Sequence, residues 1–371
     1  MKFSTSFVLL CCIFACSHGE DAEQCEEDKC LIDSNCRCSS TNNPIDASTA
    51  PQLVVLAFVE AVTTELYENR WSELLESRKN PDGSYIGATF YVPHEYTDYQ
   101  KVQDIASIGF EVAVHSISND AHQDYWRDAN VTLLEQEFGG QRKIISKFAN
   151  IDEKYITGVM TPQFQLAGDN SIKAFVQQGF AYDSSWPTKS PYFPYTFDYA
   201  STQSCDVGNS CPKESHPGFW EAPIIDLVSE DDVCATIAAC FRQRNNQTKE
   251  EISDWLVQQV DTQRQANRAP VILIIESTWF DNVENSWDGL VDALDKLEAL
   301  PDVYFVTQAR VIEWLKNPVP LSEFETGLIE PALGCSPFTC KLSKPDGTIR
   351  YMNSCVQCPK SYPWLGNPEG N

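Results

Sequence analysis

The chain has 371 residues and a formal net charge of −26. This charge argues against nucleic acids and anionic membranes as partners, because both would repel the protein. It is compatible with a neutral polysaccharide and would attract a cationic one, but we favour solubility in a secreted protein as its role. The length suits one large α/β domain or two smaller ones.

The first residues are typical of a secretory signal peptide. Lys2 precedes an apolar run from Phe7 to Ala15, and the small residues Ser17–His18–Gly19 follow as a cleavage site. The run is far shorter than the ~20 residues that span a bilayer, and no later segment reaches that length. We therefore expect a signal peptide at residues 1–19 and a soluble, secreted, extracellular mature protein.

The cysteines predict a disulfide framework. Three of the 15 lie in the signal, and the remaining twelve fall in three groups of four, near residues 25–38, 205–240 and 335–358. In an exported chain this even number indicates up to six bridges, whose pairing the sequence leaves open. A zinc or redox pair at Cys355 and Cys358 is the alternative for the last group. The sequons at Asn130 and Asn246 are candidate glycosylation sites.

Between the Cys-rich ends, short apolar runs alternate with longer amphipathic ones. The predicted strands are Leu53–Phe58, Gly87–Val92, Glu111–Ser116, Ile156–Met160, Phe180–Asp183, Trp220–Ile225, Val271–Glu276 and Val303–Thr307. The predicted helices are Asp98–Ser107, Val131–Phe148, Glu250–Gln263 and Trp287–Leu300. This alternation indicates a (β/α) barrel over residues 51–330, with a Cys-rich leader at 20–50 and a Cys-rich tail, packed on the barrel, at 331–371.

Polar and aromatic segments follow several predicted strands, where the active sites of barrels gather. They are Ala57–Phe58–Val59–Glu60, His115–Ser116–Ile117–Ser118–Asn119, Gly158–Val159–Met160–Thr161–Pro162, Asp183–Ser184–Ser185–Trp186–Pro187, and Glu276–Ser277–Thr278–Trp279–Phe280. Further segments of the framework are His94–Tyr99, Pro217–Pro223 and Tyr362–Gly370.

These segments resemble the five motifs of the insect chitin deacetylases, in the polysaccharide deacetylase (NodB-like) family. The resemblance runs from about Cys36 to the C-terminus. It implies a distorted, incomplete (β/α) barrel and a metal-dependent hydrolysis of N-acetyl groups. In that family an Asp is the general base, another Asp and two His hold zinc, an Arg orients the base and a third His is the general acid.

Most reactive positions of these motifs carry other residues here. Val59 stands at the base, Met160 at the orienting Arg and Glu276 at the acid. The aligned metal ligands are Glu60, His115 and Asn119, and an amide oxygen is a poor ligand for zinc. We therefore expect no intact catalytic set and no cofactor, with zinc bound only if this degenerate site still holds metal. His122, seven residues after His115, would reach the site only on a helix, and a surface or packing role is favoured.

The aromatic residues of the motifs survive. Trp186, Trp220, Trp279 and Phe280 lie in or beside motif loops, and flat rings suit stacking on pyranose rings. Packing in the core is the alternative for each ring taken alone. Asp183 is expected to bond the backbone of its own loop.

The sequence thus favours a secreted chitin deacetylase-like protein without catalytic activity. Its expected partners are chitin or chitin oligosaccharides in an extracellular chitin matrix, with no nucleic acid and no membrane. One alternative is an active metal-dependent chitin deacetylase with unusual ligands. Another is a hydrolase that uses Glu60 and Glu276 as paired carboxylates. A third is a structural or interaction protein that binds no sugar, and the oligomeric state is left open.

Overall fold

The strands of the central sheet run almost entirely parallel. The computed structural model describes residues 20–206, 210–229, 233–242, 246–327 and 334–371. The strands are β1 (Gln52–Phe58), β2 (Thr89–Val92), β3 (Glu111–Val114), β4 (Gly158–Val159), β5 (Tyr182–Asp183), β6 (Pro187–Thr188), β7 (Tyr195–Phe197), β8 (His216–Glu221), β9 (Ile224–Ile225), β10 (Leu227–Val228), β11 (Val233–Cys234), β12 (Val271–Ile275), β13 (Val303–Phe305), β14 (Phe338–Ser343) and β15 (Ile349–Ser354). Nine of them form one sheet in the order β12-β1-β2-β3-β4-β5-β8-β7, with β13 also paired to β1.

Helices follow most of these strands. The α-helices are α1 (Thr64–Leu66), α2 (Ser72–Leu75), α3 (Tyr99–Ser107), α4 (Gln123–Arg127), α5 (Val131–Leu134), α6 (Gly140–Phe148), α7 (Asp169–Gln177), α8 (Ile237–Cys240), α9 (Lys249–Gln265), α10 (Ser277–Asn282), α11 (Ser286–Glu298) and α12 (Gln308–Lys316). The π-helical turns are Tyr67–Trp71 and Glu135–Gly139, and the 3-10 helices are Ile32–Ser34, Glu153–Tyr155, Pro162–Phe164 and Leu321–Glu323.

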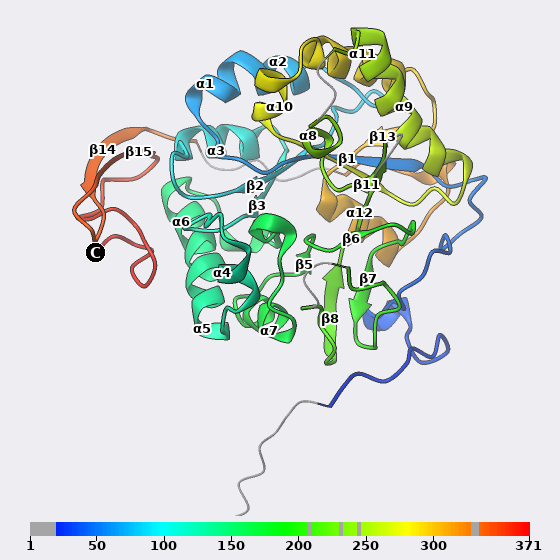
Figure 1. The fold of residues 1–371 in the computed structure, drawn as a ribbon, viewed down its shortest axis with the longest axis horizontal. Coiled ribbons are helices and arrows are strands. Elements are labelled where there is room, and N and C mark those ends of the chain that lie inside the picture. The colour runs from blue at the N-terminus through cyan, green and yellow to red at the C-terminus, as the bar shows by residue number, and fades with distance from the viewer. Residues whose placement is uncertain (1–19, 207–209, 230–232, 243–245, 328–333) are drawn as a thin grey trace, which may run out of the picture.

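Strand β1 lies at the middle of the core (Figure 1), and its seven residues are all buried. Leu53, Val55 and Ala57 join an inner cluster with side chains of the neighbouring strands. The alternate residues point outward into a second cluster with the helices. Because the side chains of a strand alternate between its faces, this strand is apolar throughout. The inner cluster and the outer helices define the predicted distorted (β/α) barrel. Among the described residues its two end strands, β12 and β7, are not paired with each other.

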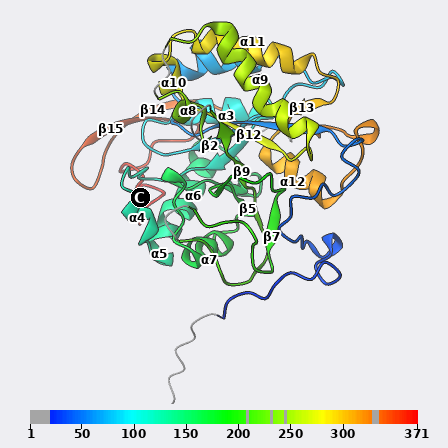
Figure 2. The same ribbon diagram turned by 45° about the vertical axis from the view of Figure 1, so that its right-hand side comes forward.

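The helices form layers on both sides of the strands. Figure 2 shows α9 and α11 on one side and α5 to α7 on the other. Helices α9 and α11 approach closely at Gly289, where an added Cβ would lie 2.6 Å from Ile252. A larger residue at Gly289 would therefore push the two helices apart.

The predicted elements are present, with changes at their ends. The predicted strand Trp220–Ile225 is divided into β8, which pairs with β5, and β9, which pairs with β6. The predicted helix Val131–Phe148 contains the π turn between α5 and α6. Helices α7 and α12 were not among those predicted, although the apolar residues on their buried faces carried the signal.

All the cysteines outside the predicted signal are bridged within their groups. The bridges are Cys25–Cys38, Cys30–Cys36, Cys205–Cys211, Cys234–Cys240, Cys335–Cys355 and Cys340–Cys358. The predicted disulfide framework is therefore confirmed. The alternative of a zinc or redox pair at Cys355 and Cys358 is wrong, because each of them is bonded to another cysteine.

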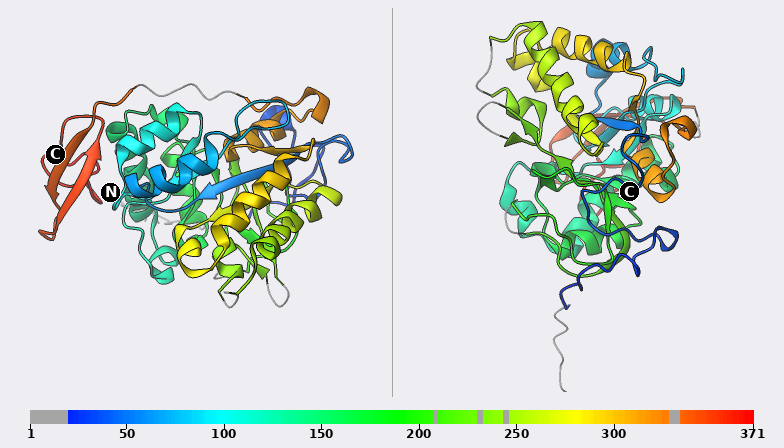
Figure 3. Two further views of the ribbon diagram at one scale, coloured as in Figure 1. Left: turned by 90° about the horizontal axis from the view of Figure 1, so that it is seen from above. Right: turned by 90° about the vertical axis from the view of Figure 1, so that its right-hand side faces the viewer.

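The two Cys-rich ends lie at opposite sides of the barrel (Figure 3). In the leader, Asn35 accepts a hydrogen bond from the indole of Trp220 on β8 at 3.0 Å. In the tail, the carbonyl of Pro363 accepts a hydrogen bond from Nε2 of the buried His94 at 2.8 Å. The leader and the tail are thus each hydrogen-bonded to barrel side chains. The predicted signal peptide lies outside the described residues, and no helix among those described is long and apolar enough to cross a bilayer.

Candidate functional site

The motif segments meet at one edge of the sheet. The register pairs Phe58 with both Phe90 and Ile275, and the following strands continue in parallel to β5 and β8. Because the carboxyl ends of parallel strands lie at the same edge, the residues after β1, β3, β4, β5 and β12 share this rim. The rim is where the chemistry of a barrel enzyme is built.

Val59, which aligns with the general base of the family motif, has no proton acceptor in its side chain. The side chain of the next residue, Glu60, is directed toward the end of β12. The carboxylate of Glu60 accepts hydrogen bonds from the backbone N–H of Ser277 at 3.1 Å and from the Ser277 hydroxyl. Burial raises the pKa of Glu60 to about 7, against the opposing bonds from Ser277. Repulsion from Glu276 raises this pKa further and Arg70 lowers it. Burial therefore favours the protonated form of the Glu60 carboxyl more than in a free glutamate.

His115 is buried and neutral. Its Nδ1 lies 2.8 Å from the carbonyl oxygen of Met160, so Nδ1 carries the proton and Nε2 keeps a lone pair. Burial lowers the pKa of His115 to about 4, and the bond to Met160 opposes this shift. The side chain of Met160 is fully buried in the inner cluster, where it can orient no base.

The remaining predicted ligand, Asn119, and the alternative His122 lie between β3 and α4. Asn119 is exposed and has a φ of 46°, in the left-handed region that asparagine tolerates. His122 is exposed, and its ring is bonded to Asp120 at 2.7 Å. Because the segment between His115 and His122 is not helical, the alternative that places both rings on one helix is wrong.

The rim residues do not fit a catalytic zinc ion. Such an ion needs three His or carboxylate ligands, whereas here one ligand is an amide and Glu60 is bonded to Ser277. Among the described residues two groups of three candidate ligand atoms lie within 4.8 Å of one another, and neither includes Glu60 or His115. One group consists of disulfide cysteines. In the other, Asp169 already accepts bonds from two backbone N–H groups and His216.

The fourth motif forms a buried hydrogen-bonded network. Asp183 accepts bonds from the backbone N–H of Ser185 at 3.1 Å and from its hydroxyl at 2.6 Å. The prediction that Asp183 bonds its own loop is therefore confirmed. Asp183 also faces the carboxyl of Glu221, and both side chains are fully buried. Burial raises the pKa of both groups, so the pair holds a proton near neutral pH.

The structure corrects the prediction of a groove lined by motif aromatics. Trp186, Trp220 and Trp279 are only 3%, 1% and 1% exposed. The indoles of Trp186 and Trp220 donate to Ser204 and Asn35, both at 3.0 Å. These rings have no face open to a sugar, because large apolar side chains at strand ends gain most from burial in the core.

Phe280 is half-buried beneath the guanidinium of Arg70, which lies 5.1 Å from the ring centre. Its ring also packs against Trp71, Trp279 and Trp287. It therefore belongs to an aromatic cluster rather than to an open stacking surface.

A pocket of about 430 Å³ lies beside the position of the acid, between α8 and α10. Glu276, Thr278, Trp279 and Asn282 line it from one side, with Arg242 and other residues opposite. We call it the rim pocket. The buried Nε1 of Trp279 has no hydrogen-bond partner among the described residues. The rim pocket is the part of the degenerate site with room for a small polar ligand.

Sequence reasoning missed two residues of this site. Ser277 donates hydrogen bonds to the carboxylate of Glu60, and nothing in the sequence around Ser277 predicts this contact. Glu221 pairs with Asp183 because β8 lies beside β5, in register. A carboxylate at the end of an otherwise apolar strand segment was the available signal.

Comparison with known proteins identifies the family. No model of a known protein family matches the chain. Chitin deacetylase 8 of Bombyx mori is 34% identical over 361 residues, which cover 94% of each chain. Chitin deacetylase 1 of Bombyx mori is 32% identical, with 94% of this chain and 69% of the relative covered. The chain therefore belongs to the chitin deacetylase family, as its motifs predicted.

Solved structures give weaker likenesses. A probable polysaccharide deacetylase from Pseudomonas aeruginosa PAO1 has a TM-score of 0.47 at 12% identity, covering 75% of this chain and 96% of its own. A CE4 family pseudoenzyme from Bacillus anthracis has a TM-score of 0.37 at 11% identity, covering 66% of this chain and 60% of its own. Both scores lie below 0.5, and we draw no conclusion from them.

Proposed function

We propose that this protein is a secreted, chitin-binding member of the chitin deacetylase family that lacks deacetylase activity. One observation carries the proposal: no proton acceptor stands at the position of Val59, and the neighbouring carboxylate of Glu60 is bonded to Ser277.

Deacetylation requires two proton transfers, which is why the missing proton acceptor matters. Hydrolysis of an N-acetyl group needs a base that takes a proton from water and an acid that protonates the leaving amine. A bound metal ion polarises the amide when it is present. Val59 can perform no proton transfer, and Glu276 would have to replace a histidine as acid. Loss of a positioned base or acid costs ~10²–10⁴-fold each, although such losses do not simply add.

The proposals of chitin binding and of secretion are supported by observations other than the substituted motif residues. Both relatives described above bear the name chitin deacetylase. Bridged cysteines throughout the chain suit an oxidising extracellular environment. Both sequon residues, Asn130 and Asn246, are exposed and so accessible to glycosylation, which stays a prediction. The net charge of −26 also favours a neutral or cationic polymer over an anionic one.

A second candidate function follows from the pKa of Glu60. A carboxyl with a pKa of about 7 is suited to general-base catalysis near neutral pH, so Glu60 could replace the missing aspartate. This candidate is an active deacetylase with an unusual base. It requires Glu60 to break its bonds to Ser277 before it can approach water.

One preparation of the purified protein separates the two candidates. It would be incubated with an N-acetylglucosamine pentamer, with added zinc or with chelator, and released acetate would be measured. Retention on chitin beads would be measured in parallel. We expect retention without acetate release above that of a variant with both Glu60→Ala and His115→Ala. Acetate release that exceeds this control and is lost with chelator would establish the active enzyme instead.

A further inference from the structure

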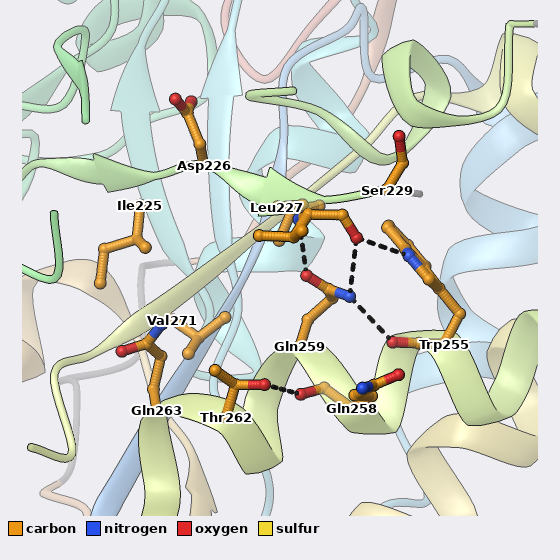
Figure 4. A pocket seen from close by; sticks show the side chains of 11 residues that line it. Ile225, Asp226, Leu227, Ser229, Trp255, Gln258, Gln259, Thr262, Gln263 and Val271 are labelled. Carbon is orange, nitrogen blue, oxygen red and sulfur yellow. Dashed lines mark hydrogen bonds between the residues drawn. The ribbon is translucent and has the colours of Figure 1, made fainter. Parts of the chain in front are cut away.

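A second pocket lies away from the degenerate rim, between α9 and the β9–β10 segment (Figure 4). Its volume is about 370 Å³, at the lower end of the range for pockets that bind small ligands. We call it the α9 pocket. Glu60 and Glu276 do not line it, so it is separate from the motif residues.

The α9 pocket combines apolar and polar walls. The exposed side chain of Val228 and the half-buried indole of Trp255 supply apolar and aromatic surface, with the buried Ile225, Leu227 and Val271 beneath them. The amides of Gln258 and Gln263 add hydrogen-bonding groups. A pyranose has the matching surface, because its C–H groups form apolar patches and its hydroxyl groups surround them.

The walls are fixed before a ligand arrives. The side chain of Gln259 accepts a bond from the backbone N–H of Val228 at 2.8 Å and donates to its carbonyl at 3.2 Å. The indole N–H of Trp255 donates to the same carbonyl at 2.9 Å. Strand β10 is in turn paired with β11, which the Cys234–Cys240 bridge joins to α8. Such preorganisation lowers the entropy cost of binding.

Two amide groups are available to a ligand. The side chains of Gln258 and Gln263 make no hydrogen bond to the described residues, whereas that of Gln259 is bonded to Val228 on β10 and to the carbonyl of Trp255. Gln258 is exposed and Gln263 half-buried, so both can reach a bound molecule. Amides both donate and accept hydrogen bonds, as do the acetamido and hydroxyl groups of N-acetylglucosamine.

The charge of the α9 pocket favours a neutral ligand. Of the described residues that line it, Asp226 alone is charged. Figure 4 shows its carboxylate pointing away from α9 and the glutamines. A phosphate or other anion would find no cation here, and a cation would find its carboxylate turned aside.

We propose that the α9 pocket binds an N-acetylglucosamine unit of chitin, with the sugar against Trp255 and its polar groups on Gln258 and Gln263. The proposal rests on the proposed function, to which it adds a binding site that the buried motif aromatics cannot supply. It places sugar recognition on the side of α9 rather than on the degenerate motifs.

The test uses the full-length secreted protein and the N-acetylglucosamine tetramer in isothermal titration calorimetry. We expect the Gln258→Ala/Gln263→Ala variant to bind roughly tenfold more weakly or worse, because it loses the hydrogen bonds of two side-chain amides. The matched control is Gln265→Ala, which changes an exposed glutamine of the same helix outside the pocket and should leave affinity unchanged. Trp255→Ala should weaken binding by at least as much.

Other outcomes separate the two proposals. If the wild-type protein is retained on chitin but the double glutamine variant binds the tetramer within twofold of it, the α9 pocket is not the site. If the wild-type protein binds neither the tetramer nor chitin beads, the proposed function itself fails. Circular dichroism checks folding, and the exposed or half-buried glutamines keep the test decisive if Trp255→Ala does not fold.

Discussion

Two regions at the carboxyl ends of the strands differ sharply. Around β5 and β8, Asp183 keeps its hydrogen bonds to Ser185 and its buried carboxyl partner Glu221. Around β1 and β12, Val59 has replaced the base, and the half-buried Glu276 has no side-chain bond to the start of α10. In the first region buried groups depend on Asp183, which accepts two hydrogen bonds from Ser185. In the second region Val59 has no polar side-chain atom and Glu276 makes no side-chain cap bond to α10.

The difference separates what folding requires from what catalysis requires. A residue such as Asp183 cannot be lost without leaving buried polar partners unpaired, which costs stability. A reactive residue on the rim stabilises the fold little, so its replacement leaves the structure intact. On the proposed function, the family fold would persist without the reactive groups of the rim.

The largest expected effect is a gain of activity. A variant with Val59→Asp, Glu60→Asp, Asn119→His and Glu276→His restores base, acid and zinc ligands together. We expect acetate release from an N-acetylglucosamine pentamer at least about 100-fold above wild type, in proportion to bound zinc. The control carries Val59→Asn instead and should stay inactive. If wild type released acetate as fast as the restored variant, the substitutions on the rim would not have removed catalysis and the proposed difference between the two regions would be wrong.

The next effect concerns stability. Asp183→Ala should lower the free energy of unfolding by about 3 kcal/mol, because the buried backbone N–H and hydroxyl of Ser185 lose their acceptor. Glu276→Ala should change it by no more than about 0.5 kcal/mol. Urea denaturation measures both. Equal losses for the two variants would show that the rim contributes to the fold as strongly as the network does.

The free energy of unfolding should depend on pH through the buried carboxyls of Asp183 and Glu221. Burial raises the native pKa of Asp183 to about 7 and that of Glu221 well above its usual range. Their contribution to stability is therefore complete at low pH and is lost as the pH rises through these native pKa values. His94 and His115, whose pKa values burial lowers to about 3 and 4, act in the opposite direction. We therefore compare wild type with Glu221→Gln across this window.

The difference in unfolding free energy between wild type and variant should shift in favour of the variant as the pH rises, because only the wild type must ionise the buried Glu221. Urea denaturation at several pH values measures it. A difference that is constant with pH would mean that the two carboxyls hold no shared proton.

The smallest effect concerns Glu60. Ser277→Ala removes the hydroxyl that favours the charged carboxylate, so the pKa of Glu60 should rise from about 7 by roughly one unit. Titration of its side-chain carboxyl by ¹³C NMR measures the shift. Ser72→Ala, which changes a half-buried serine of α2 that makes no bond to Glu60, is the control. A pKa that falls would show that Ser277 does not hold this carboxyl.

The sequence determined the frame of this protein. Apolar runs such as Leu53–Phe58 predicted the buried strands, because local hydrophobicity selects the segments that a sheet can bury. The even cysteine count predicted bridges, and the substitutions at Val59, Met160 and Glu276 predicted the loss of reactive groups. Each of these conclusions depends on residue type and near neighbours alone.

The tertiary structure decided which groups meet and which are accessible. The contact of Glu60 with Ser277 joins residues 217 positions apart, and the pairing of Asp183 with Glu221 depends on the order of strands. Burial of Trp186 and Trp220 likewise depends on elements that close over them. Contacts between distant segments arise from packing, so local pattern identified the aromatic residues and only the folded chain showed which of them a sugar could reach.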